Sequence, residues 1–385
     1  MIAAQPFAFS APTNVHFGDG VSTRIADVLP KGVRSLALIR GGRGVAAEPL
    51  VTRLRTQGYA VAEVRCAGEP SVASINAAVD ELRPRAVEAV VACGGGAVLD
   101  TGKAVAFCLG HDLTLKEDFS AISADLLAAP GPIPCIAVPT TAGTGAEVTA
   151  NAVLELPSRG AKVSLRGRAL FPVTALVDPL LLPSARRETI LSSGLDAVVQ
   201  TIESYTSCAA TPFSDALTRL NIDLGLRSLR AVIKNGTPQA WRDLAWVSMT
   251  SGLALANSGL GAAHGLASVL GGRYGAPHGV LCGRFLVPVL RQNLKVADPR
   301  SDAHRRILHA CAAIAEVFAP KQGGDDLSGL ESWQNANGLP RLASFGVVES
   351  DFAELASQSA GASSSKKNAV VLEDAHYAAI LAEAL

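Results

Sequence analysis

Two histidines, His264 and His278, offer the clearest chemistry in this sequence. Each is followed by a glycine, and the segment that contains them carries a single charged residue, Arg273. Imidazole nitrogens bind divalent transition metals and transfer protons near neutral pH. A histidine in an apolar segment can also be a hydrogen-bonded core residue, so the pair by itself leaves both interpretations open.

A carboxylate and an amide, Asp196 and Gln200, lie in the apolar segment GLDAVVQTIES. Their spacing of four places both on one face of a helix. A carboxylate in an apolar stretch needs a partner, because burying its charge alone is costly. Asp196 together with His264 and His278 is a suitable ligand set for a divalent metal ion.

Three glycines, Gly94, Gly95 and Gly96, connect the apolar run AVVAC to a helical pattern. Glycines let backbone N–H groups approach a phosphate, and a helix that begins there directs its positive dipole end at the anion. Asp100 and Lys103, in the first turns of that helix, can reach ribose hydroxyls or phosphate. The alternative is an ordinary strand-to-helix turn, because the segment is not G-x-G-x-x-G.

A second polar loop, PTTAGTGAEVT, follows the apolar run that ends at Val138. Its hydroxyl groups can donate to phosphate oxygens or to a nicotinamide carboxamide, and its glycines permit a close approach. The alternative is a polar turn that caps a strand. Two such loops in one half of the chain favour a dinucleotide ligand.

The elements that would position these loops alternate between strands and helices. This alternation predicts βαβ units with a parallel sheet, whose ligands bind at the carboxyl ends of the strands. The predicted strands are Ser35–Ile39, Tyr59–Val64, Ala89–Ala92 and Ile133–Val138, and the predicted helices are Gly44–Thr56, Ser71–Leu82 and Leu99–Leu109.

The proline-containing segment Val173–Pro183 interrupts this alternation. We predict a domain boundary there, with an α/β domain at 1–183 and a helical domain at 184–385, as expected when a chain exceeds the size of one core. The predicted helices of the second domain are Ser184–Ser207, Ser214–Lys234, Ala240–Asn257, His304–Phe318 and Asp374–Leu385.

Composition narrows the class of protein. Lys plus Arg equals Asp plus Glu, at 34 each, which argues against a nucleic-acid partner. No long uncharged apolar stretch predicts a membrane helix, and no leader sequence is apparent, so we expect a cytoplasmic protein. The cysteines form no C-x-x-C pair, and most lie in apolar runs, where we interpret them as small buried hydrophobes. They are Cys66, Cys93, Cys108, Cys135, Cys208, Cys282 and Cys311.

Five ordered segments together resemble the iron-containing (group III) alcohol dehydrogenase family, which has glycerol dehydrogenases and maleylacetate reductases among its relatives. The segments are GGGAVLDTGKA, PTTAGTGAEVT, VDPLLLP, GLDAVVQTIESY with PFSDA, and AHGLASVLGGRYGAPHG. The resemblance implies a Rossmann-like domain with a parallel sheet, followed by an all-helical domain, as in dehydroquinate synthase. It also implies a site in the cleft between the domains, and a homodimer.

The resemblance assigns roles to individual residues. It implies that Asp196, His264 and His278 are metal ligands, and we include Gln200, which stands where the family usually has a ligand histidine. Ser268 stands where a second, non-ligand histidine faces the substrate, so the predicted catalytic residues are His264, His278 and Ser268. The implied cofactor-binding residues are Gly42, Gly94, Gly95, Gly96, Asp100, Thr140, Thr141, Thr144 and Lys162.

Two departures from the family pattern bear on the cofactors. Gly42 stands where members that prefer NAD often have Asp, and Arg40 and Arg43 beside it can pair with a 2′-phosphate, so the sequence favours NADP over NAD. The amide of Gln200 is a weaker ligand than imidazole. Three protein ligands still suffice for catalytic zinc, so we expect Fe or Zn.

The predicted function is an NAD(P)-dependent oxidoreductase that interconverts an alcohol and an aldehyde or ketone, with the carbonyl polarised by a divalent metal. One alternative is a metal-independent reductase of an anionic carbonyl compound, similar to maleylacetate or phosphonoacetaldehyde, with the anion bound by the hydroxyls and lysines of Ser363–Asn368. Two others are a dehydroquinate synthase-like lyase and a nucleotide-binding protein that has lost catalysis.

Overall fold

The computed structural model describes residues 6–42, 44–156, 158 and 160–385, which divide into two compact units. One unit comprises residues 11–186, and the other comprises residues 187–385 together with the described residues before Ala11. The predicted boundary after residue 183 lies close to this division, which follows residue 186.

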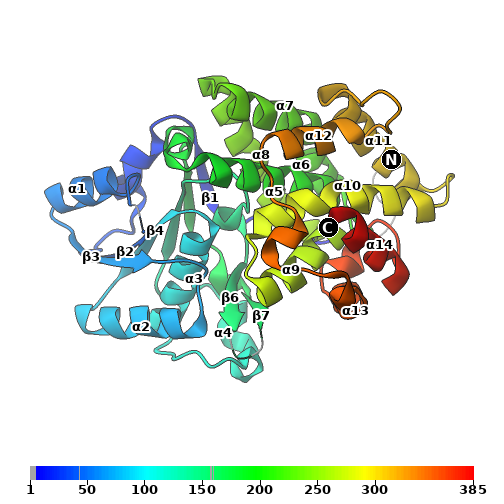
Figure 1. Ribbon diagram of the computed structural model, residues 1–385. Coiled ribbons are helices and arrows are strands. Elements are labelled where there is room, and N and C mark those ends of the chain that lie inside the picture. The colour runs from blue at the N-terminus through cyan, green and yellow to red at the C-terminus, as the bar shows by residue number, and fades with distance from the viewer. Residues whose placement is uncertain (1–5, 43, 157, 159) are drawn as a thin grey trace. The chain divides into compact units, whose positions relative to one another are not determined.

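The first unit contains a six-stranded sheet in which every pairing is parallel (Figure 1). The strand order is β1-β8-β5-β4-β2-β3, and an antiparallel hairpin of β6 and β7 is separate from it. This confirms the predicted parallel sheet. The strands are β1 (Asn14–Phe17), β2 (Ser35–Gly41), β3 (Ala60–Cys66), β4 (Ala89–Gly94), β5 (Cys135–Pro139), β6 (Asn151–Leu156), β7 (Ala161–Arg166) and β8 (Thr174–Val177).

Two apolar layers cover the faces of this sheet, because the central strands carry apolar side chains on both faces. On one face, Ile39 and Val90 pack with apolar residues of α2 and α3. On the other face, Leu38 and Val91 pack with residues of α1 and of a short 3-10 helix, Val21–Val28. The α-helices of this unit are α1 (Glu48–Thr56), α2 (Val72–Leu82), α3 (Gly96–Gly110) and α4 (Ala124–Ala128).

The strand order places the predicted cofactor loops side by side at the carboxyl ends of neighbouring strands. The chain reverses its direction of travel across the sheet between β2 and β4, and β5 lies on the far side of β4. In open parallel sheets, ligands bind at the carboxyl ends of the strands at such a switch point. Gly42, Gly94–Gly96 and Thr140–Thr144 lie at or directly after the carboxyl ends of β2, β4 and β5 respectively.

The boundary segment Val173–Pro183 is not a linker. Its first part forms β8, which pairs with β1 and β5 in the sheet, and a 3-10 helix, Pro179–Ser184, follows. The Asp178 carboxylate accepts hydrogen bonds from the backbone N–H groups of Gly20 and Ser22 and from the Ser22 hydroxyl. The Asp-Pro step therefore ends a strand within the first unit.

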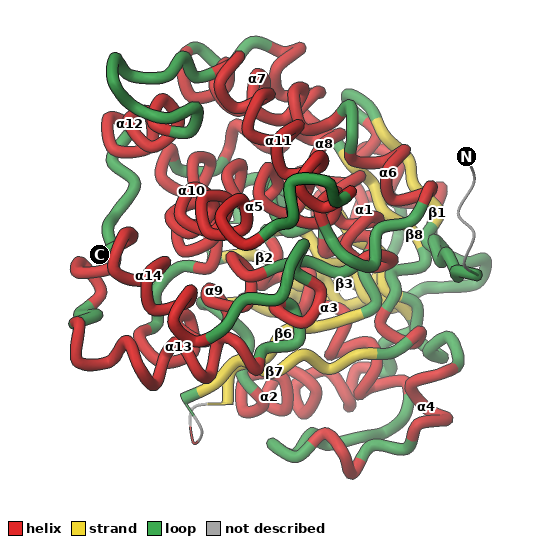
Figure 2. Tube along the Cα trace, turned by 90° about the vertical axis from the view of Figure 1, so that its right-hand side faces the viewer, coloured by secondary structure: helices red, strands yellow, loops and turns green. Residues whose placement is uncertain are grey.

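The second unit is helical, as predicted. Helix α5 packs against α7, α8 and α10, and all its residues from Gly194 onward are buried. Figures 1 and 2 both place α9 beside α13, which in turn contacts α14. The helices are α5 (Arg187–Thr206), α6 (Pro212–Thr218), α7 (Asn221–Lys234), α8 (Pro238–Ser258), α9 (Ala262–Tyr274), α10 (His278–Val296), α11 (Asp302–Val317), α12 (Ser328–Ala336), α13 (Phe352–Gly361) and α14 (Asp374–Ala384).

One predicted helix, Ser214–Lys234, is wrong because the structure divides it into α6 and α7. The side-chain amide of Asn221 donates to the Leu217 carbonyl at 2.8 Å and to the Thr250 hydroxyl at 2.9 Å. The side chain thus takes the carbonyl that a continuous helix would use for the backbone N–H of residue 221.

Within the described ranges, no single helix is long and apolar enough to cross a membrane. Helices α8 and α9 meet the criterion of length and composition only when taken together across a bend of 97°.

Candidate metal centre and cofactor loops

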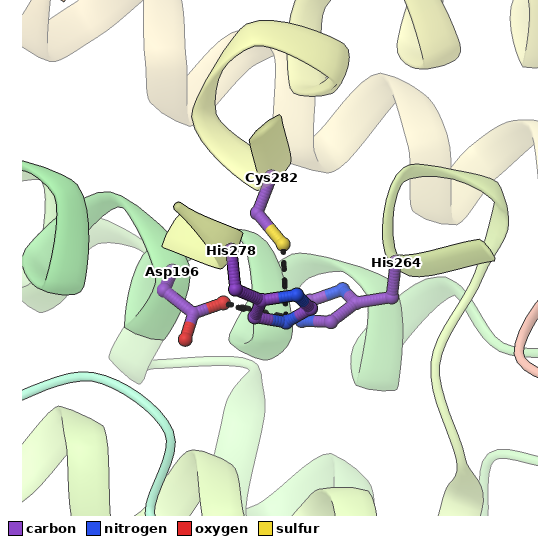
Figure 3. Close-up of side chains that lie close together, drawn as sticks. All are labelled: Asp196, His264, His278 and Cys282. Carbon is purple, nitrogen blue, oxygen red and sulfur yellow. Dashed lines mark hydrogen bonds and ion pairs between the residues drawn. The ribbon is translucent and has the colours of Figure 1, made fainter. Parts of the chain in front are cut away.

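Four side chains that can bind a metal converge in the helical unit (Figure 3). Asp196 comes from α5, His264 from α9, and His278 and Cys282 from the first two turns of α10. One ligand atom of each lies within 4.8 Å of the others. His264 Nε2 is 3.3 Å and His278 Nε2 is 3.8 Å from Asp196 Oδ1, and Cys282 Sγ is 3.5 Å from His278 Nε2.

The burial of this cluster fits a bound cation. Asp196 is 2% and His264 is 5% exposed, and in the described part of the chain Asp196 Oδ1 and His264 Nε2 have no hydrogen-bond partner. Buried polar atoms are rarely left unpaired, because the water that they lose must be replaced. Carboxylate, imidazole and thiolate are ligands of divalent transition metals, so the residues present fit such an ion.

Glu203, two turns after Asp196 on α5, supports His264. Its Oε2 lies 2.6 Å from His264 Nδ1, and its carboxylate accepts hydrogen bonds from the backbone N–H groups of Gly261 and Ala263. Glu203 therefore caps the N-terminus of α9, where a negative charge is favourable. A carboxylate at Nδ1 also directs the lone pair of Nε2 toward a metal, as in many metal sites.

Neighbouring groups shift the protonation of this cluster. Burial raises the pKa of Asp196, but His278 and His264 outweigh it and hold that pKa below its ordinary value. Burial lowers the pKa of His264, but Cys282, Asp196 and Glu203 raise it well above its ordinary value. Burial raises the pKa of the Cys282 thiol to about 12. A divalent ion held by these side chains would compete with protons for them.

Gln200 and Ser268 lie on the same helices as the cluster. Gln200 is one turn from Asp196 on α5, and its amide nitrogen donates to the Ser251 hydroxyl of α8 at 2.8 Å. Ser268 is half-buried and one turn from His264 on α9. Their assignments, Gln200 as a ligand and Ser268 as a catalytic residue, stay predictions.

In the α/β unit, the glycine turn and the threonine loop are in direct contact. The backbone N–H of Thr140 donates to the Gly94 carbonyl at 2.9 Å. A Cβ at Gly96 would lie 2.8 Å from Thr144 Oγ1, and a Cβ at Gly95 would lie 3.2 Å from Thr141 Oγ1. Helix α3 begins at Gly96, so its free N–H groups adjoin both loops. The arrangement suits a phosphate group, although the individual cofactor contacts stay predictions.

Other residues predicted on the cofactor side already have partners in the protein. Asp100 Oδ1 pairs with Lys103 Nζ at 2.8 Å, and Asp100 Oδ2 accepts from the Val153 N–H at 2.9 Å. Lys103 is 1% exposed and also donates to the Ala146 carbonyl. These contacts attach α3 to the threonine loop and to β6, which follows it. They give Asp100 a structural role, and its contact with a cofactor stays a prediction.

Lys162 and Arg40 are also paired. Lys162 lies on β7 and approaches Glu69 at 3.4 Å and Glu155 at 3.8 Å. Arg40 Nε lies 2.7 Å from the Glu63 carboxylate, and Arg43 is outside the described residues. Because Glu63 already neutralises Arg40, the basis for expecting NADP is weakened.

The segment Ser363–Asn368 is partly buried. The Asn368 side chain accepts from the Ala262 N–H of α9 at 3.2 Å and donates to the Asn293 amide oxygen of α10 at 2.7 Å. Ser365 is 9% exposed, whereas Lys366 and Lys367 are exposed. The segment thus packs against the helices that carry the histidines, and this packing gives no direct support for an anion site.

Sequence reasoning overlooked Cys282 and Glu203. The interpretation of Cys282 as a small buried hydrophobe was incomplete, because its sulfur lies among the candidate ligands. The signals were helical spacings: Cys282 is four residues after His278, and Glu203 is seven after Asp196. Each spacing places the two side chains on one face of a helix.

Comparisons with known proteins agree with this architecture. A family model described as iron-containing alcohol dehydrogenase matches residues 12–179, and one for the C-terminal part of that family matches residues 190–385. The probable alcohol dehydrogenase EutG of Salmonella typhimurium is 34% identical over 72% of this chain and 73% of its own length. Alcohol dehydrogenase 4 of Saccharomyces cerevisiae is 30% identical over 90% of both chains. The crystal structure of a 1,3-propanediol oxidoreductase covers 99% of this chain and 100% of its own, with a TM-score of 0.85 and 27% identity.

An α/β unit with ligand loops at its switch point, and a helical unit with a buried carboxylate and histidines, are the two parts of a two-domain dehydrogenase. The chain belongs to the iron-containing alcohol dehydrogenase family. It is therefore an alcohol dehydrogenase of a family that uses NAD(H) and a divalent metal. Family membership therefore favours the predicted alcohol dehydrogenase over the alternative of a dehydroquinate synthase-like lyase.

Proposed function

We propose that this enzyme interconverts a small alcohol and its aldehyde or ketone by hydride transfer, with a nicotinamide cofactor bound by the α/β unit and a divalent metal ion held by Asp196, His264 and His278. The observation that supports this proposal is that Asp196 Oδ1 and His264 Nε2 are buried, lie 3.3 Å apart as an ion pair, and have no hydrogen-bond partner among the described residues. When bound, the metal supplies Lewis acidity toward the substrate oxygen and the nicotinamide carries the hydride.

The protein groups around the site have separate tasks. Glu203 holds the His264 ring in one orientation through Nδ1. His278 has a side chain that is 35% exposed, which leaves one side of the cluster accessible to a substrate. We propose that Ser268, one turn from His264, holds or passes the proton of the substrate hydroxyl. Relatives named as alcohol and propanediol dehydrogenases support a small, uncharged substrate.

The proposal includes no preference for NADP(H), because Arg40 is already paired with Glu63. It also sets aside the anionic substrate, because Ser365 and Asn368 of the segment suggested for it are buried against the helices. A homodimer and a cytoplasmic location remain predictions from the sequence.

Metal analysis combined with an activity assay tests the proposal. The purified protein is analysed for metal by mass spectrometry and assayed with NADH and NADPH against short aldehydes, before and after chelation. We expect one bound divalent metal per chain and loss of activity on chelation. Full activity in a metal-free preparation would contradict the role of the metal.

The variant His264→Ala provides a second test. We expect it to lose activity and metal while it binds NADH with nearly unchanged affinity, because His264 lies in the helical unit. His304→Ala is the matched control, since His304 is a half-buried histidine of α11 outside the cluster. Wild-type activity in His264→Ala would show that the cluster is not the catalytic centre.

A further inference from the structure

We propose that Cys282 is the fourth protein ligand of the metal ion and binds it as a thiolate, in the place that the sequence assigns to Gln200. This inference rests on the proposed function, because it presumes that Asp196, His264 and His278 hold a divalent ion. The inference names a ligand residue that the family match does not give, and it bears on which metal the site prefers.

The position of Cys282 on α10 brings its sulfur to the cluster. Cys282 follows His278 by one helical turn, so both side chains project from the same face toward α5 and α9. Figure 3 shows the sulfur above the two imidazole rings and directed at them. Cys282 is fully buried, and its Sγ is 3.5 Å from His278 Nε2.

The distances between the ligand atoms match a four-ligand metal site. Metal bonds of about 2.0–2.3 Å in tetrahedral geometry place neighbouring ligand atoms roughly 3.3–3.8 Å apart. Three of the separations are 3.3 Å from Asp196 to His264, 3.5 Å from Cys282 to His278, and 3.8 Å from Asp196 to His278. All four atoms lie within 4.8 Å of one another.

Two further observations distinguish this cysteine from an ordinary buried one. Asp196 Oδ1 and His264 Nε2 are buried, have no hydrogen-bond partner among the described residues, and face the same space as the sulfur. By contrast, Cys93, Cys108 and Cys135 are packed in the apolar layers of the α/β unit. Cys282 is thus the buried cysteine whose neighbours are themselves metal-binding groups.

Gln200 has a different task in this arrangement. Its amide nitrogen donates to the Ser251 hydroxyl at 2.8 Å, and that hydroxyl donates to the Ser248 carbonyl at 2.8 Å. These hydrogen bonds connect α5 to α8 at Gln200, one helical turn from Asp196. We assign Gln200 the role of a positioning residue.

A thiolate ligand alters both the charge and the metal preference. On binding, the S–H bond of Cys282 breaks, the proton passes to solvent, and a sulfur–metal bond forms. The carboxylate of Asp196 and the thiolate together then neutralise the two positive charges of the ion. Thiolate and imidazole ligands favour zinc, so we infer that zinc rather than iron is the resident metal.

Cobalt substitution tests this assignment without relying on activity. The wild-type protein is loaded with Co²⁺, and its near-ultraviolet spectrum is recorded for thiolate-to-cobalt charge transfer. We expect this band in the wild type, its loss in Cys282→Ser, and its retention in Gln200→Ala. Cys282→Ser should still bind Co²⁺, with an affinity reduced roughly 10–100-fold or more, since partners outside the ligand shell already contribute that much.

A matched control and a measurement without mutation complete the test. Cys311→Ser changes another buried cysteine of the helical unit and should keep the band. X-ray absorption of the zinc-loaded wild type should show one sulfur at about 2.3 Å from the zinc ion. This measurement needs no variant, so it tests the assignment even if Cys282→Ser does not fold. Stoichiometric metal without sulfur would overturn the role of Cys282 and leave the proposed function intact. Absence of any metal binding would overturn both.

Discussion

The Glu203 carboxylate lies 2.6 Å from Nδ1 of His264, while Nε2 of the same ring faces Asp196 at 3.3 Å. The two residues are far apart in the chain, on α5 and α9, and the contact is buried. It links the N-terminus of α9 to the orientation of a candidate ligand, so a change at Glu203 should affect metal binding before it affects the fold.

We predict that Glu203→Gln weakens metal binding roughly 10–100-fold, the usual effect of removing a partner of a ligand histidine. The amide keeps one oxygen, which can still accept from Nδ1 and from the Gly261 N–H, but its nitrogen replaces the oxygen that accepts from the Ala263 N–H, and the side chain lacks the negative charge. Competition with a chelator measures the affinity, and circular dichroism checks the fold. Glu354→Gln is the control, because Glu354 pairs with Arg273 of α9 at an exposed site away from the cluster. Wild-type affinity in Glu203→Gln would contradict this role.

The start of α10 depends on close packing against α5. A Cβ at Gly279, next to His278, would lie 2.3 Å from the Ser192 carbonyl oxygen and 3.3 Å from Asp196 Cβ. The nearest atom belongs to the backbone, so the helices must separate. We predict that Gly279→Ala lowers stability by about 1–3 kcal/mol and reduces metal content, because it moves His278 away from Asp196.

Thermal unfolding and metal analysis of Gly279→Ala measure these effects. Gly361→Ala is the matched control, since a Cβ at Gly361 meets no atom within 4 Å and the residue ends helix α13. We expect that control to be neutral or slightly stabilising. If Gly279→Ala retained the metal and the midpoint of the wild type, α10 would not need this approach to hold His278.

The sequence was sufficient to predict the parallel sheet and most of the longer helices. Apolar runs of four to six residues located β2 to β5, since buried parallel strands are apolar on both faces. It was not sufficient for β8, whose four residues adjoin two prolines and are held by pairing with β1 and β5. Helix α9 is rich in glycine and α10 contains Pro288, so their stability comes from burial against neighbouring helices rather than from local preference.

For the site, the sequence identified groups but not their contacts. Asp196, His264 and His278 were apparent because a carboxylate and imidazoles are rare in apolar segments. Cys282 was hidden because a cysteine in such a segment is usually a packing residue. Glu203 was hidden because its partner belongs to another helix, and only the fold brings them together.

Gly96 is the second close approach that can be tested. A Cβ there would lie 2.8 Å from Thr144 Oγ1 and 2.9 Å from Thr144 Cγ2. We predict that Gly96→Ala displaces the threonine loop and weakens NADH binding about tenfold or more. A tenfold loss corresponds to about 1.4 kcal/mol, within the range of about 1–3 kcal/mol that overpacking usually costs. Fluorescence titration with NADH measures the affinity.

Metal content should stay unchanged in Gly96→Ala, because the candidate ligands lie in the other unit. Gly68→Ala is the control, since a Cβ at Gly68 meets no atom within 4 Å. NADH affinity equal to the wild type would show that the contact between the glycine turn and the threonine loop does not shape the cofactor site.

Glu147, in the second half of the threonine loop, should make stability depend on pH. It is 3% exposed, and burial raises its pKa to about 7 from an ordinary value of 4.5, although its own backbone N–H and Lys103 lower it. Because the folded-state pKa is the higher one, the contribution to stability is complete below pH 4.5 and is lost as pH rises through about 7. The loss is about 3 kcal/mol, from roughly 1.4 kcal/mol per pKa unit.

We therefore predict that Glu147→Gln unfolds at a higher temperature than the wild type at pH 8, and that this difference shrinks as the pH falls toward 5. The amide cannot ionise, so the variant avoids the cost of a buried negative charge that the wild type bears above pH 7. Thermal midpoints of both proteins across that range measure the effect, and Glu81→Gln, at an exposed glutamate of α2, should follow the wild type. A constant difference between Glu147→Gln and the wild type across this range would mean that Glu147 does not change its charge there, in which case its interaction with Lys103 dominates over burial.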